Sequence, residues 1–338
     1  MKTKTSPKVK NSRIVAEHAH LPARPWEILT LDVPAPMEQL GGQFAIRTDL
    51  KGRYLTAVGG GGRTTDVIHT DAIDPRAWEE FKFWVDSVTH KQYAFQTVTG
   101  NFITAVDAGG RITDTIHSDA TVISTWEMFQ LLPQTALPRF AIQTLRGFFL
   151  TAVGGGGHNS GDTIHTDALK ALKWEQFNIV RRLDFGTGST YGIFAAYNPK
   201  NQQTFGNWLC AAGGGGLPSG TNTIFLWITW PLWMYWTLLK QDDGTYALQT
   251  ISGNVLTANA GGLPGAGFRT DTSPMDIGNF EKFTIEDNGE GSNFTALIKT
   301  YSGTYLGWGP PLPNGWPSVV TVPNANEATN WQFQLFGL

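Results

Sequence analysis

The chain repeats one segment of about 50 residues six times, and three of the copies share nearly the same pattern. Each of these three contains the string Asp-x-Ile-His-Thr/Ser-Asp-Ala, followed by Trp-Glu-x-Phe. Equivalent positions recur every 48 residues: Asp66, Asp114 and Asp162; His69, His117 and His165; Trp78, Trp126 and Trp174. A constant interval of this length indicates one supersecondary unit that has been copied, so it constrains the architecture before any single residue is interpreted.

Within a repeat the pattern is typical of strands. Phe44, Ile46 and Thr48 alternate with the residues between them, which is the period of a half-buried strand. The first repeat predicts four strands, at 44–48, 54–58, 65–70 and 78–85. A run of four glycines at 59–62 separates the second strand from the third, and glycine takes positive φ angles there without a steric cost.

Repeats four to six follow the pattern more loosely. Residues 246–258 match residues 93–105 in type, position by position, and 213–216 is again a run of four glycines. We place the boundary between two modules of three repeats within Arg182–Ser189. The predicted organisation is an N-terminal extension at 1–40, partly disordered, one domain at 41–184 and a divergent, Trp-rich domain at 190–338.

Three four-stranded units that close on themselves predict an all-β chain of two tandem β-trefoil domains, with six four-stranded repeats in total. Such closure removes exposed sheet edges. The glycine-rich turn and the terminal Trp-Glu-x-Phe resemble the repeats of fascin-like β-trefoils, over about 295 residues from Phe44 onward. That resemblance implies actin-filament binding or cross-linking, although fascins resemble four such modules and this chain has two.

Composition excludes several classes of protein. The net charge of −3 gives no global attraction to nucleic acid or to anionic membrane. A single cysteine, Cys210, rules out an intrachain disulfide framework and favours a reducing compartment. Residues 1–13 are basic but lack the apolar stretch of a secretory signal, so we expect a cytoplasmic protein, with release by a non-classical route left open. The apolar segment 224–239 contains Pro231 and is too short for a spanning helix, so we expect no transmembrane segment.

No catalytic constellation stands out from the repeats, so we expect neither an enzyme nor a cofactor. The glycine runs lack the Lys-Ser/Thr and the following helix of a phosphate loop. Cys210 lies on a predicted strand and is interpreted as a buried structural thiol. A metal site made by His69, His117 and His165 would need inward side chains, and we expect none.

The repeated polar string is the main candidate for a binding site. If Ile68 and its copies belong to the core, His69 and its copies point outward, because neighbouring strand residues face opposite sides. Carboxylates and imidazoles bind sugar hydroxyls, and a nearby aromatic ring stacks on the apolar sugar face. The candidate carbohydrate ligands are therefore Asp66, His69, Asp71, Asp114, His117, Asp119, Asp162, His165 and Asp167.

A structural role for the same residues competes with this interpretation. Asp66 and its copies could instead hydrogen-bond backbone amides at the glycine turn, and Asp71 and its copies could open the next loop. We expect Trp78, Trp126 and Trp174 to pack in the core at strand ends. We expect Glu79, Glu127 and Glu175 to be solvated or to bind turns.

The second module has lost most of the polar string. Phe225-Leu-Trp-Ile replaces His69-Thr-Asp-Ala in repeat four, and only repeat five keeps a remnant at 269–271. Trp227, Trp230 and Trp233 form either an interface between the modules or an exposed aromatic platform.

The sequence favours a non-catalytic, lectin-like protein that binds glycans or glycoconjugates through several weak sites. Actin-filament cross-linking is the alternative. A toxin component that interacts with lipid is a third hypothesis.

Overall fold

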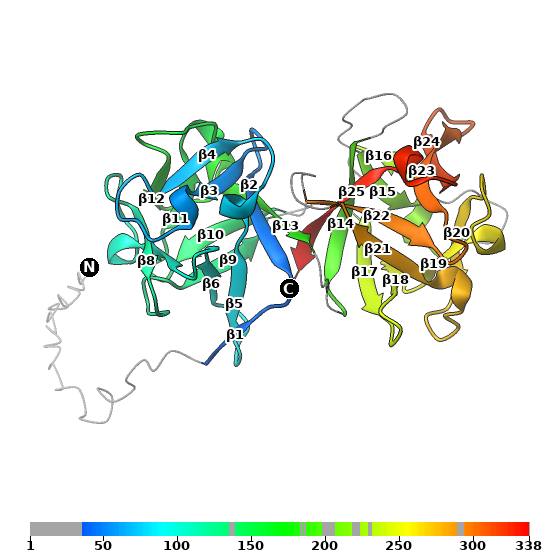
Figure 1. Cartoon of the computed structure of the whole chain (residues 1–338), viewed down its shortest axis with the longest axis horizontal. Coiled ribbons are helices and arrows are strands. Elements are labelled where there is room, and N and C mark those ends of the chain that lie inside the picture. Colours follow the sequence, from blue (N-terminus) through cyan, green and yellow to red (C-terminus); the bar gives the residue numbers. More distant parts are fainter. Residues whose placement is uncertain are drawn as a thin grey trace, which may run out of the picture. The chain divides into compact units, whose positions relative to one another are not determined.

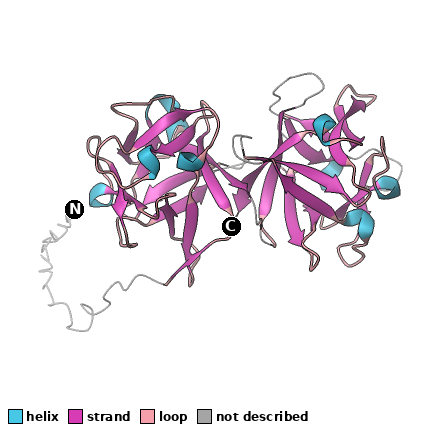
Figure 2. Ribbon diagram, in the orientation of Figure 1, coloured by secondary structure: helices cyan, strands magenta, loops and turns pink. Residues whose placement is uncertain are grey.

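The computed structural model describes residues 36–134, 139–182, 185, 187–197, 207–217, 224–228, 232–288 and 294–337. In these residues all regular structure consists of β-strands and three-residue 3-10 turns, without an α-helix (Figure 2). The predicted all-β class is therefore confirmed. Residues 1–35, including most of the predicted extension, lie outside the described part. The last residues of the predicted extension contain a described strand, β1 (Met37–Gln39), which pairs with β5.

Six strands of the first three repeats close into a ring (Figure 1). They are β2 (Gln43–Thr48), β5 (Lys82–Asp86), β6 (Tyr93–Gln96), β9 (Phe129–Pro133), β10 (Phe140–Thr144) and β13 (Gln176–Arg182). From β5 to β13, each strand pairs antiparallel with the next in that order. The Phe44–Phe81 bridge connects β2 to the β5 side, and β13 pairs back onto β2.

Each repeat also contributes one hairpin outside the ring. The hairpins are β3 (Tyr54–Ala57) with β4 (Ile68–Ala72), β7 (Phe102–Ala105) with β8 (Ile116–Ala120), and β11 (Phe149–Ala152) with β12 (Ile164–Ala168). A closed ring of six strands with three hairpins related by a pseudo-threefold axis is a β-trefoil-type fold.

Repeats four to six build a second ring in the same order. Its members are β14 (Thr190–Tyr197), β17 (Tyr235–Lys240), β18 (Tyr246–Thr250), β21 (Phe283–Asp287), β22 (Thr295–Thr300) and β25 (Asn330–Gly337). They pair in sequence, and β25 pairs back onto β14.

Three hairpins again accompany this ring. They are β15 (Asn207–Ala211) with β16 (Ile224–Trp227), β19 (Val255–Ala258) with β20 (Phe268–Thr272), and β23 (Tyr305–Pro311) with β24 (Pro317–Val322). β13 also pairs with β25, and residues 35–338 form one compact unit. The predicted division into two domains therefore stays a prediction.

The core follows the strand alternation. Phe44, Phe83, Phe95, Phe129 and Phe177 fill the first ring and are at most 2% exposed. Phe44 stacks on Phe83, and Phe95 stacks on Phe129. Aromatic rings of this size from every repeat explain how short strands bury enough apolar surface to hold the ring closed.

The four-glycine run follows the second strand as a short 3-10 turn, η1 (Val58–Gly60), and all four glycines have positive φ as expected. The third strand begins at Ile68 rather than at the predicted Thr65, because Asp66 takes a left-handed conformation with a φ of 50°. This breaks the alternation before the strand. A regular strand would place Val67 on the same side as His69, but Val67 is buried and His69 is partly exposed.

Candidate functional site

The repeated aspartate and histidine of each copy form a hydrogen-bonded pair. His69 Nε2 lies 2.7 Å from Asp66 Oδ1, and the equivalent atoms of the other two pairs are also 2.7 Å apart. A carboxylate only accepts, so Nε2 donates in each pair. Ile68 is buried beside the partly exposed His69, which confirms that this histidine points away from the core.

The pairs are accessible to a ligand. The aspartate side chains at positions 66, 114 and 162 are 47%, 51% and 61% exposed. The hydrogen bond from His69 is the largest cause that lowers the pKa of Asp66 below its usual value, and Arg63 adds to the effect. The Asp66 carboxylate is therefore held in its charged form. In each pair the histidine contacts one carboxylate oxygen, and the other oxygen can accept from a ligand.

The second aspartate of the string contributes less. Asp71, Asp119 and Asp167 lie at the end of the hairpin strands, on the surface. Of these, Asp167 approaches its histidine, with 4.0 Å between Asp167 Oδ1 and His165 Nδ1.

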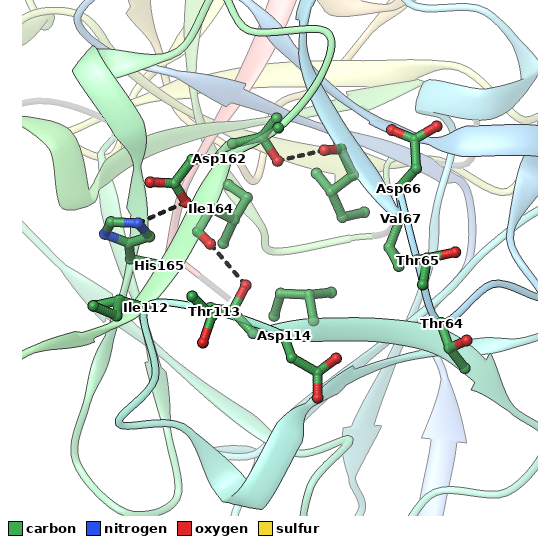
Figure 3. Close-up of a pocket in the computed structure, with 15 residues that line it drawn as sticks. Thr64, Thr65, Asp66, Val67, Ile112, Thr113, Asp114, Asp162, Ile164 and His165 are labelled. Carbon is green, nitrogen blue, oxygen red and sulfur yellow. Dashed lines mark hydrogen bonds and ion pairs between the residues drawn. The ribbon is translucent and has the colours of Figure 1, made fainter.

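The three first aspartates meet around one cavity of about 650 Å³. Its lining consists of the equivalent segments Thr64–Ile68, Ile112–Ile116 and Gly161–His165 (Figure 3). We call it the axial cavity, because each repeat supplies the same segment around the pseudo-threefold axis. The repeated polar strings thus share one depression, of the size that binds small ligands.

Hydrogen bonds between repeats hold the wall of the axial cavity. Thr115 Oγ1 donates to the Ile164 carbonyl at 2.7 Å, and Thr163 Oγ1 donates to the Ile68 carbonyl at 2.5 Å. The equivalent residue of the first repeat is Val67, which has no hydroxyl, so this ring of hydrogen bonds contains two members instead of three. The backbone of the wall is therefore fixed before a ligand arrives.

Charge around the cavity is not symmetric. Arg63 lies 3.6 Å from Asp66, and Arg111 lies 3.3 Å from Asp114 and also binds Asp107. His158 occupies the corresponding place in the third repeat. The third repeat is therefore the more acidic side of the rim.

The tryptophans of the Trp-Glu-x-Phe strings are not core residues, contrary to the prediction. Trp78, Trp126 and Trp174 are 49%, 44% and 47% exposed. In the first repeat Trp78 lies in a 3-10 turn before β5, η2 (Ala77–Glu79). This turn directs the indole ring outward. Sequence reasoning missed this exposure because Trp is so often buried. The one sequence signal for this exposure was the glutamate that follows the tryptophan in all three copies.

That glutamate is buried and binds a turn. Thr56 Oγ1 donates to Glu79 Oε1 at 2.5 Å, and the Arg76 amide donates to Glu79 Oε2 at 2.7 Å. Glu127 and Glu175 repeat both contacts. The turn-binding interpretation is confirmed, and the solvated one is wrong.

The second ring replaces polar residues by apolar ones on its first hairpin. The side of that hairpin away from the core bears a cluster that includes Trp208, Cys210, Phe225 and Met234. Burial raises the pKa of the Cys210 thiol to about 12, which confirms a structural thiol.

Two of the three predicted platform tryptophans lie in this cluster. Trp227 packs 4.8 Å from Trp316, and Trp233 packs 6.3 Å from Phe225, measured between ring centroids. Both are half-buried, against neighbours from the second ring. Trp230 lies outside the described residues.

The described residues contain neither a metal-binding cluster nor a membrane-spanning helix. No group of three or more His, Cys, Asp or Glu side chains could hold a metal ion in the part of the chain that the structure describes. Among the same residues, no helix is long and apolar enough to cross a membrane.

Comparisons with known proteins give similarities to solved structures alone. No protein-family model and no curated protein matches the sequence. A mosquitocidal holotoxin matches with a TM-score of 0.37 and 10% identity, over 87% of this chain and 34% of the toxin chain. The Polyporus squamosus lectin, solved with a human-type influenza-binding epitope, matches with a TM-score of 0.34 and 19% identity, over 45% of this chain and 50% of the lectin.

The Rhizoctonia solani agglutinin matches with a TM-score of 0.34 and 14% identity, over 44% of this chain and all of the agglutinin. This chain spans about a third of the length of the toxin and about half that of the Polyporus lectin. Similarities this weak do not transfer a function.

Proposed function

We propose that this chain is a non-catalytic, lectin-like protein whose first ring binds carbohydrate in the axial cavity, and that its two rings are tandem β-trefoil domains. The observation that supports the proposal is the convergence of three exposed, histidine-held carboxylates on one depression of about 650 Å³. A depression of this size accommodates a mono- or disaccharide.

The hydrogen-bonding character of the rim defines the ligand. Asp66, Asp114 and Asp162 accept hydrogen bonds, so the ligand must bring donors, as sugar hydroxyls do. The apolar side chains of Val67 and Ile112 line the same cavity and suit the C–H face of a sugar ring. Negative charge on the rim disfavours sialylated, sulfated or uronic-acid sugars, so we expect neutral or amine-bearing ligands.

A glycan array with two matched variants tests the proposal. The first variant is Asp66→Asn/Asp114→Asn/Asp162→Asn, which keeps the shape of the rim and removes its charge. The second is Asp242→Asn/Asp243→Asn/Asp276→Asn, which removes the same charge from exposed positions of the second ring. We expect the first variant to lose at least about tenfold in glycan affinity, because each lost charged hydrogen bond is worth about 1.5–3 kcal/mol before compensation. The second variant should bind as the wild type does.

Two results would contradict the proposal. One is a wild-type protein that binds no glycan above background. The other is equal glycan binding by the wild type and the cavity variant. We expect a smaller loss of glycan binding from the histidine variants His69→Ala, His117→Ala and His165→Ala than from the aspartate variant. Each histidine only orients a carboxylate, and the carboxylate itself binds the ligand.

The alternatives from the sequence stay predictions. Actin-filament binding, which the fascin resemblance implies, is decided by co-sedimentation with filaments. Lipid interaction is decided by leakage of liposomes.

A further inference from the structure

The exposed tryptophans of the first ring form a second feature that the axial cavity does not explain. An indole ring is a large apolar group, and burying it would stabilise the fold. Trp236 and Trp331 are fully buried, yet Trp78, Trp126 and Trp174 are each left nearly half in water. Phe280 occupies the equivalent place in repeat five and is 44% exposed. Four repeats thus leave this ring exposed, whereas Trp233, at the equivalent position of repeat four, is half-buried in the apolar cluster.

The turns that carry the exposed rings are anchored by their glutamates. In the first repeat, the hydrogen bond from Thr56 to Glu79 fixes η2 to the hairpin, and the hydrogen bond from the Arg76 amide to Glu79 closes the turn beside Trp78. The ring lies over the glycine turn, where a Cβ added to Gly60 would be 3.5 Å from Trp78 Cδ1. In repeat five a Cβ added to Gly261 would be 2.7 Å from Phe280 Cε1. In repeats one and five the aromatic ring therefore packs against the glycine turn.

The turns that carry the rings also touch the glycine turns in repeats three and five. η4 (Val153–Gly155) contacts η5 (Lys173–Glu175), and η7 (Asn259–Gly261) contacts η8 (Asn279–Glu281). A ring held this way is ordered before binding, so little conformational entropy is lost when a ligand stacks on it.

An aliphatic side chain from another repeat lies beside the turn in repeats one and three. A Cβ at Gly60 would lie 2.9 Å from Val98 Cγ1, and Val98 is 55% exposed. A Cβ at Gly155 would lie 2.6 Å from Leu50 Cδ2, and Leu50 is 49% exposed. We call the set of Trp78, Trp126 and Trp174 with these neighbours the peripheral platforms.

The size and repetition of the platforms select the ligand. A stable protein interface buries on the order of 1,000 Å² or more, whereas each platform offers one indole and one aliphatic side chain. One indole matches one pyranose ring, whose C–H face stacks on an aromatic surface. Platforms that are weak singly become effective when one polymer, or several chains of one solid, engages more than one of them.

We infer that the peripheral platforms are binding sites for neutral polysaccharides whose pyranose rings present flat C–H faces, as β-linked glucose and N-acetylglucosamine units do. These sites are separate from the axial cavity and share with the proposed function only the class of ligand.

Binding to insoluble cellulose, chitin and β-1,3-glucan tests the inference. The variants are Trp78→Ala/Trp126→Ala/Trp174→Ala and the conservative Trp78→Phe/Trp126→Phe/Trp174→Phe, for which Phe280 is the natural precedent. We expect the alanine variant to bind at least one of these solids about tenfold more weakly than the wild type, and the phenylalanine variant to stay within about threefold. The Asp66→Asn/Asp114→Asn/Asp162→Asn variant should bind the solids as the wild type does, which separates this site from the axial cavity.

A second measurement does not depend on the alanine variant folding. Protein labelled with 5-fluorotryptophan is titrated with cellohexaose and chitohexaose, and the signals of the three platform tryptophans are assigned with single Trp→Phe variants. Their ¹⁹F shifts should move with at least one oligosaccharide.

Three outcomes would overturn the inference. The first is wild-type protein that binds none of the three solids and shows no ¹⁹F shift. The second is a folded alanine variant with undiminished binding. The third is an alanine variant that dissociates a wild-type oligomer in size-exclusion chromatography, since the platforms would then be a self-association surface.

Discussion

Replacing Glu79 by Met should destabilise the chain strongly, and replacing Thr56 by Cys at the same time should recover much of the loss. Glu79 is 6% exposed and accepts hydrogen bonds from the Thr56 hydroxyl and the Arg76 amide. The chain contains the apolar counterpart of this pair in repeat four. There Cys210 and Met234, at the equivalent positions, are both fully buried in one cluster.

The magnitude follows from the two hydrogen bonds. A hydrogen bond to a charged group contributes about 1.5–3 kcal/mol, and a buried partner left unsatisfied costs about 1–3 kcal/mol. Since Met fills most of the glutamate volume, we expect Glu79→Met to cost about 3 kcal/mol. In Thr56→Cys/Glu79→Met no hydroxyl is left without an acceptor, and the cost should fall to about 1–1.5 kcal/mol, that of the Arg76 amide.

Urea unfolding of the wild type, both single variants and the double variant, with a reducing agent present, measures the coupling between the two positions. The same cycle at Thr104 and Glu127 provides an internal repetition, because that pair makes the equivalent contacts. Thr56→Cys alone should cost about 1 kcal/mol, because it removes a hydrogen bond to the carboxylate, so we expect a coupling free energy of about 2.5–3 kcal/mol in both cycles. Strictly additive single effects would refute the argument, since they would mean that the hydroxyl and the carboxylate do not depend on each other.

Two further perturbations test the wall of the axial cavity and a turn next to the ring. Val67→Thr should stabilise the chain by about 0.5–1.5 kcal/mol, because its hydroxyl can complete the ring of hydrogen bonds by donating to the Ile116 carbonyl; thermal unfolding checks this, and an equal or lower melting temperature contradicts it. Asp86→Asn should cost about 1–3 kcal/mol at pH 7, because the buried carboxylate accepts from Thr89 and from the amides of Lys91 and Gln92. Burial raises the pKa of Asp86, but these hydrogen bonds outweigh it and bring the pKa well below its usual value. The stabilisation is therefore complete above about pH 5 and is lost progressively as the pH falls below that. The difference between wild type and variant in urea unfolding should shrink between pH 5 and pH 2, and a difference that stays constant over this range would be contrary to expectation.

The interval of 48 residues made the main architectural features predictable. Every copy had to form the same unit, so strands in one copy implied strands in all, and three copies implied closure. The alternation around Phe44 and Ile46 identified the core side of β2 correctly. The positive φ angles of residues 59–62 followed from glycine itself.

The exposure of the three repeated tryptophans could not be predicted from the residue alternation. Alternation places a side chain only where the backbone is a regular strand, and Trp78 lies in a 3-10 turn. Val67 shows the same limit, because the left-handed Asp66 before it ends the alternation. Local backbone geometry of this kind depends on contacts between distant residues, such as that of Glu79 with Thr56.

The sequence alone determined that the chain is built from repeated β-hairpin units and that each of the first three carries the same Asp and His. These properties are local and periodic, so they can be predicted without knowledge of long-range contacts. Only the tertiary structure decided that the three aspartates surround one axial cavity and that the tryptophans face water. Both depend on how the three repeats pack around a common axis. Contacts between segments that are 48 residues apart cannot be predicted from the residue pattern within one repeat.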